Sequence, residues 1–92
     1  MFQTASDITH ETANAVLKVG LKSIEEGAVQ VDCAPLTHFD SSALAVLLAW
    51  RRAAAERKSG GRNLTAINVP VALASLARAY GVDAIAFGEA AV

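Results

Sequence analysis

The sequence predicts a single α/β domain in which helices pack against a small mixed β-sheet. Segments with the apolar spacing of helices alternate along the chain with short β-branched segments, and this order favours a sheet joined by right-handed crossovers. The length of 92 residues allows one modest core and no second domain. We expect that core to span about residues 2–87, with a tail at 88–92.

The first half of the chain predicts a helix between two strands. Residues 2–8 favour a short strand, and residues 10–26 favour an amphipathic helix with Thr9 as its N-cap and Gly27 at its end. The apolar residues of that helix recur at the spacing of one helical face: Ala13, Val16, Leu17, Leu21 and Ile24. Residues 28–33 then favour a central strand, and residues 35–39 a loop, because Pro35 cannot donate to a ladder.

The second half predicts two more helices. Residues 43–58 are rich in helix formers and follow the triplet Asp40-Ser41-Ser42, and Gly60-Gly61 marks a turn. Residues 63–68 favour a short strand, and residues 70–80 a third helix that is capped at Asn68 or Val69 and ends at Gly81. Residues 82–87 favour an edge strand or a final turn.

Composition limits the classes of partner. Hydrophobic residues make up 53% of the chain and charged residues 18%, so we expect some apolar surface to require a partner. The net charge of −1 argues against binding nucleic acid, which needs several cationic contacts to phosphate. A lone cysteine excludes an internal disulfide and suits the cytoplasm. No apolar run approaches a membrane span, so we expect membrane association only through a partner.

The sequence predicts no catalytic site. His10 and His38 have no neighbours at metal-ligand spacing, so the sequence predicts no metal and no cofactor. Ser41, His38 and Asp40 contain the residue types of a hydrolase triad, but residues so close in sequence rarely adopt triad geometry. No nucleophile elbow is present. The sequence therefore indicates a protein that is not an enzyme.

The triplet Asp40-Ser41-Ser42 supports two interpretations. Asp and Ser are common N-caps, because their side-chain oxygens accept hydrogen bonds from the unpaired amides of a first helical turn. Alternatively, a serine hydroxyl exposed at a helix N-terminus is a docking or phosphorylation candidate, since a phosphate there meets amide donors beside the repelling charge of Asp40. Both interpretations remain open from the sequence.

The residues also resemble those of STAS domains, named for sulfate transporters and anti-sigma factor antagonists. The similarity lies in Val29-Gln-Val-Asp32, in the run from Phe39 through Asp40-Ser41-Ser42 to Leu48, and in Asn68-Val69-Pro70. It continues from Leu73 to Asp83, where the ending Tyr80-Gly81-Val82-Asp83 is most similar to the STAS subunit of the bacterial Mla phospholipid-transport system. Ala43 stands where the family often has glycine. The resemblance implies a STAS fold, with Ser41 as the partner-contacting or phosphorylatable hydroxyl.

The resemblance implies two alternative functions. In the first, the chain is a non-catalytic accessory subunit of an Mla-type ABC transporter that binds and stabilises or regulates the cytosolic ATPase subunit. Its contact residues would be Phe39, Asp40, Ser41, Ser42 and Ala43. It would then lie in the cytoplasm, peripheral to the inner membrane through that partner. In the second, the chain is an anti-sigma factor antagonist regulated by phosphorylation of Ser41.

Overall fold

The computed structural model describes residues 2–56 and 64–81 and shows a small α/β domain. Its elements, in chain order, are β1 (Phe2–Gln3), β2 (Asp7–Ile8), α1 (Ala13–Glu25), β3 (Gln30–Asp32), β4 (His38–Phe39), α2 (Ser42–Ala55), β5 (Thr65–Ile67) and α3 (Val71–Ala79). This order confirms the predicted fold class. The predictions for Gly60-Gly61, for the strand or turn at 82–87 and for the tail at 88–92 lie outside the described residues.

The strands form two small parallel sheets. One has the order β1-β3-β5, with Val31 opposite both Phe2 and Ala66, and the other pairs β2 with β4. The amide of Thr4 donates to the Asp32 carbonyl (3.0 Å), and that of His38 donates to the Ser6 carbonyl (3.1 Å). Residues 2–8 therefore run alongside residues 31–39. Every strand pairing in the described part is parallel, whereas we expected a mixed sheet.

Two short strands differ from the prediction. The segment 2–8 is not one strand but two, and the predicted loop at 35–39 contains β4. Pro35 interrupts the pairing as expected, but Thr37 and His38 resume it by donating their amides to the Ser6 carbonyl. Strands of two residues carry no detectable alternation, so their positions are set by a partner segment that is distant in sequence.

The first helix begins later than predicted. Residues 10–12 form a turn, and Thr12 rather than Thr9 is the N-cap of α1. The Thr12 hydroxyl accepts a hydrogen bond from the Thr9 amide (2.9 Å), so the hydroxyl closes this turn instead of capping the helix. The predicted end is confirmed, because Gly27 has a φ of 108°, which favours glycine.

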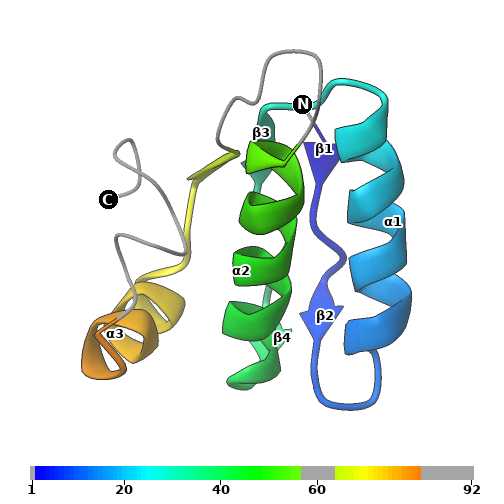
Figure 1. Cartoon of the computed structure of the whole chain (residues 1–92). Helices are drawn as coiled ribbons and strands as arrows, with labels where there is room; N and C mark the ends of the chain where they lie inside the picture. The colour runs from blue at the N-terminus through cyan, green and yellow to red at the C-terminus, as the bar shows by residue number, and fades with distance from the viewer. Residues whose placement is uncertain (1, 57–63, 82–92) are drawn as a thin grey trace.

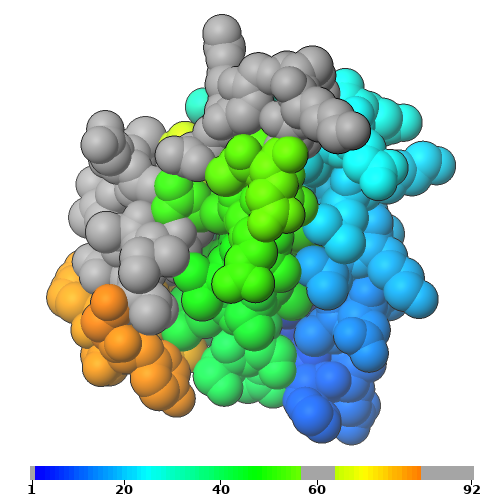
Figure 2. Space-filling model, viewed as in Figure 1, coloured from blue at the N-terminus to red at the C-terminus, as the bar shows by residue number. Residues whose placement is uncertain are grey.

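The predicted apolar face of α1 is also confirmed. Gly20 and Ile24 are buried, while Ala13, Val16, Leu17 and Leu21 are half-buried against the core. The helix lies beside α2 on one face of the strands (Figure 1), and the two helices form a continuous surface in the space-filling view (Figure 2). No helix within the ranges 2–56 and 64–81 has the length and apolarity needed to cross a membrane.

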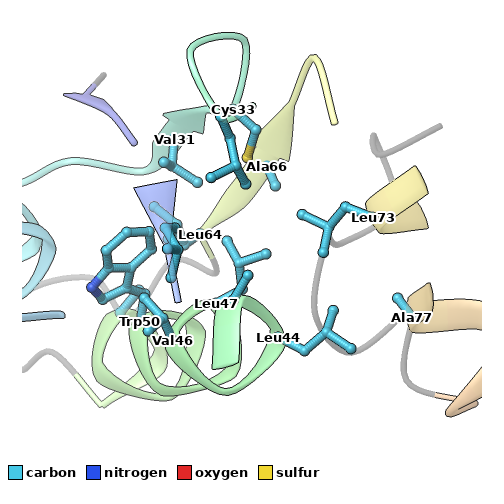
Figure 3. Packing of buried hydrophobic residues seen from close by; sticks show 14 of the residues in the cluster. Val31, Cys33, Leu44, Val46, Leu47, Trp50, Leu64, Ala66, Leu73 and Ala77 are labelled. Carbon is cyan, nitrogen blue, oxygen red and sulfur yellow. The ribbon is translucent and has the colours of Figure 1, made fainter. Parts of the chain in front are cut away.

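The third helix is one residue shorter than predicted at each end. Pro70 is the N-cap of α3, in place of Asn68 or Val69, and its extended backbone (ψ 141°) leads the chain into the helix. Asn68 instead has a positive φ of 55°, a conformation that asparagine tolerates better than most residues. Leu73 and Ala77 point from α3 toward Leu44 of α2 (Figure 3).

Trp50 of α2 is the largest fully buried side chain of the core (Figure 3). Its indole Nε1 donates to the Leu17 carbonyl of α1 (3.0 Å), and its ring meets that of Phe2 edge-on with centroids 5.1 Å apart. Trp50 therefore joins α1, α2 and β1. Cys33 is also fully buried, and burial raises the pKa of its thiol to about 12, so this cysteine is protonated at neutral pH.

Candidate functional site

The predicted site lies where the chain passes from β4 into α2. The amide of Asp40 donates to the Ile8 carbonyl (3.3 Å), which holds this junction against β2. Asp40 and Ser41 are exposed, and Phe39 and Ser42 are half-buried. These four residues, which we call the docking surface, lie together at the first turn of α2.

Ala43 does not belong to this surface. Its side chain is fully buried in the hydrophobic core, so its predicted role as a contact residue requires correction. The reason is helical geometry, since Ala43, Val46, Leu47 and Trp50 lie on the face of α2 that packs on the strands.

Asp40 provides the cap of α2 and also binds the start of the preceding turn. Its Oδ1 accepts a hydrogen bond from the Ser42 amide (2.8 Å), and its Oδ2 accepts one from the His10 amide (3.0 Å). The His10 amide and then the Ser42 amide lower the pKa of the Asp40 carboxyl below its ordinary value of 3.8. Asp40 is therefore an ionised carboxylate that is already hydrogen-bonded within the domain.

The hydroxyl of Ser41, unlike the carboxylate of Asp40, does not cap α2. Ser41 precedes the first residue of α2, but its side chain makes no capping hydrogen bond. Its carbonyl accepts from the Leu44 amide (3.1 Å), so its backbone takes part in the helix while its exposed side chain does not cap it. Of the two interpretations of Asp40-Ser41-Ser42, capping therefore belongs to Asp40, and the Ser41 hydroxyl is accessible for contact with a partner.

This division of roles predicts different effects of two alanine substitutions on stability. Asp40→Ala removes both hydrogen bonds and should lower the thermal unfolding midpoint by several degrees. Ser41→Ala removes no cap and should change the free energy of unfolding by no more than about 0.5 kcal/mol. Thermal unfolding of the two purified variants checks this. Equal losses in both would show that Ser41 shares the capping role.

The lowered pKa of Asp40 predicts acid sensitivity. A carboxyl whose pKa is lower in the folded state stabilises the fold above its unfolded pKa, and this contribution is lost as the pH falls through the folded pKa. We expect stability to decrease below about pH 4. The stability of Asp40→Asn should decrease less steeply in acid. The difference between the unfolding midpoints of wild type and this variant should therefore become smaller as the pH falls from 7 to 3. A constant difference across this range would contradict the assignment.

A second polar cluster, which the sequence did not reveal, lies at the end of β3. Asp32 is 8% exposed, and its carboxylate accepts from the Asn68 side chain (3.0 Å), the Ala34 amide (2.9 Å) and the Gln3 side chain (3.3 Å). The Asn68 hydrogen bond is the main cause of the lowered pKa of Asp32. Gln3 belongs to β1, Ala34 follows β3 and Asn68 follows β5. Because Asp32 thus links the three strands of one sheet, the cluster has a structural role. An aspartate inside an apolar strand was its only sequence signal.

The described residues contain no group of three or more His, Cys, Asp or Glu side chains placed to hold a metal ion. At the docking surface, His10 meets Asp40 through its backbone amide. The docking surface presents the exposed hydroxyl of Ser41, the carboxylate of Asp40 with its two amide hydrogen bonds, and the half-buried ring of Phe39. These groups are suited to hydrogen bonding and packing against a partner.

Parallel strands with two helices on one face, and an exposed serine at the first turn of a helix that follows a strand, are consistent with an α/β domain of the STAS type. The chain belongs to the STAS domain family, because the family model described as "Mlab, STAS domain" matches residues 3–87. Members of this family are generally non-catalytic. No curated protein and no solved structure matches the chain.

Proposed function

We propose that the chain is a non-catalytic accessory subunit of an Mla-type phospholipid ABC transporter. It binds the cytosolic ATPase subunit through the docking surface, Phe39 to Ser42, and stabilises or regulates it. The protein then lies at the cytosolic face of the inner membrane without entering the bilayer. The observation that carries this proposal is the match of residues 3–87 to the Mlab STAS model, combined with the accessible Ser41 hydroxyl.

The local geometry supports docking at this surface. Ser41 can donate or accept a hydrogen bond without disturbing the helix, because Asp40 already caps α2. The Asp40 carboxylate already accepts two hydrogen bonds from amides of its own domain. These bonds reduce the free-energy cost of removing the carboxylate from water when a partner binds. Half-buried Phe39 provides apolar area beside these polar groups.

Co-expression with the ATPase subunit of a phospholipid ABC transporter from the same organism tests the proposal. A tagged ATPase should retain the chain through size-exclusion chromatography, and its thermal midpoint should be higher in the complex than alone. If the two proteins elute separately at micromolar concentration, the proposal is wrong. An ATPase of an unrelated transporter serves as the negative control.

An anti-sigma factor antagonist is the second candidate, favoured by the same exposed Ser41 side chain at a helix N-terminus. A phosphate on Ser41 would lie beside Asp40, so it would change the charge of the docking surface without entering the core. Incubation with ATP and the serine kinases of the source cell, followed by intact-mass measurement, tests this function. A phosphorylated wild type and an unmodified Ser41→Ala would support it, whereas an unmodified wild type would contradict it.

A further inference from the structure

The turn formed by residues 9–12 lies against the docking surface without belonging to it. It joins β2 to α1 at the end of the domain where α2 also begins (Figure 1). Within this turn the amide of His10 donates to Asp40 Oδ2 (3.0 Å), while Asp40 Oδ1 accepts from the Ser42 amide of α2 (2.8 Å). The orientation of the Asp40 side chain is therefore set from two sides, and one of them depends on the shape of the turn.

The side chain of Thr12 closes this turn. Its Oγ1 accepts a hydrogen bond from the Thr9 amide (2.9 Å), and its proton is directed to the carbonyl oxygens of Asp7 and Thr9, each 3.4 Å away. Between Thr9 and Thr12 the backbone adds a hydrogen bond from the Thr12 amide to the Thr9 carbonyl (3.0 Å). The Thr12 hydroxyl thus restrains the segment that carries the His10 amide.

The same hydrogen bonds connect the turn to the start of α2. Asp7 belongs to β2, and the next residue of that strand, Ile8, accepts through its carbonyl from the Asp40 amide (3.3 Å). Asp40 is exposed, so a carboxylate held by the Ser42 amide alone would be free to adopt other rotamers. Restricting such a side chain on binding costs free energy, whereas a side chain that is already held avoids this cost.

We propose that Thr12 is a positioning residue for the docking surface. Its hydroxyl fixes the turn, aims the His10 amide at Asp40 and so holds that carboxylate in the orientation that the partner meets. Thr12 acts through Asp40 and not by touching the partner. This inference rests on the proposed docking of the ATPase, but the positioning step is measured in the free domain, so the two can fail separately.

The pKa of the Asp40 carboxyl, followed by NMR titration over the pH range in which the free domain is folded, tests the positioning step. The His10 amide is the largest cause of the lowered pKa of Asp40, so Thr12→Val, which removes the hydroxyl, should raise it toward 3.8. Thr12→Ser, which keeps the hydroxyl, should restore the wild-type pKa. At pH 7 the His10 amide proton should also shift upfield in Thr12→Val, because its hydrogen bond is weaker.

These readings separate positioning from a merely structural role. A hydroxyl that only stabilised the fold would lower the unfolding midpoint of Thr12→Val but leave the pKa of Asp40 unchanged, and that result would overturn the proposal. Thr37→Val is the control for loss of a threonine hydroxyl. That hydroxyl also donates to a backbone carbonyl, the one of Ser6 (3.4 Å), but does not close the turn that carries His10. An equal rise in the pKa of Asp40 in Thr37→Val would also overturn the proposal.

Affinity for the ATPase subunit, measured by isothermal titration, tests the consequence for docking. Thr12→Val should bind about fivefold more weakly than wild type, and Thr12→Ser should bind like wild type. In an Asp40→Ala background Thr12→Val should have no further effect, because the group through which it acts is gone. Equal affinities of Thr12→Val and wild type, or additive effects of Thr12→Val and Asp40→Ala, would overturn the proposal. If the wild type does not bind the ATPase, the proposed function fails, whereas the pKa of Asp40 still decides whether Thr12 positions it.

Discussion

Replacing Gly20 by alanine should destabilise the domain by about 2 kcal/mol or more, although glycine to alanine normally stabilises a helix interior by about 1 kcal/mol. A Cβ at Gly20 would overlap Cε2, Nε1 and Cζ2 of the Trp50 indole. The ring cannot move aside easily, because it is 1% exposed, bonded to the Leu17 carbonyl and packed against Phe2. Overpacking should therefore exceed the gain in helix propensity. Chemical denaturation of the purified variant measures the loss.

Two further variants separate overpacking from helix propensity. Ala15→Gly, at an exposed position of the same helix, should cost about 1 kcal/mol through propensity alone. In a Trp50→Phe background, which provides space, Gly20→Ala should cost less than in wild type, giving a favourable coupling free energy in a double-mutant cycle. A Gly20→Ala protein as stable as wild type, or purely additive effects, would contradict the close contact of Gly20 with Trp50.

Ser41→Asp should weaken the complex with the ATPase by about 30-fold or more while leaving the free domain folded. Burying an uncompensated charge in an interface costs about 2 kcal/mol or more, and the charge of Asp40 next to it adds repulsion. In the isolated domain the new side chain is exposed at a helix N-terminus, where a negative charge is tolerated. Ser41→Ala should bind better than Ser41→Asp. Affinities measured by isothermal titration, with unfolding midpoints alongside, test this.

Ser23→Asp is a control for the change in net charge in this experiment. It makes the same chemical change in the last turn of α1, at the end of the domain opposite the start of α2 (Figure 1). It should bind the ATPase like wild type. If Ser23→Asp and Ser41→Asp weaken the complex equally, the effect is one of net charge and not of position. If Ser41→Asp binds as tightly as wild type, Ser41 lies outside the interface.

Helical periodicity made most of this fold predictable. The faces of α1 and α3 follow from apolar spacing, and their ends near Gly27 and Gly81 follow from the positive φ values found there. The two-residue strands β2 and β4 were not predictable as a pair. They exist because the backbone of residues 6–8 meets that of residues 37–40, a contact between segments about thirty residues apart that leaves no local pattern.

The site was predictable in its position but not in the roles of its residues. The triplet Asp40-Ser41-Ser42 marked the start of α2, yet each of its side chains could cap, and only the geometry assigns the capping to Asp40. Ala43 resembled its neighbours in sequence, but the direction of the helix places it in the core.

Amide chemical-shift mapping of the labelled domain, on addition of the ATPase subunit, tests the docking surface most directly. Because the proposed contacts come from the β4–α2 junction, the amides of Phe39, Asp40, Ser41 and Ser42 should show the largest changes, and His10 should respond through Asp40. The amides around Trp50 should change little. Changes centred on α1, α3 or β1 instead, with the amides of residues 39–42 unaffected at saturation, would contradict docking through this surface.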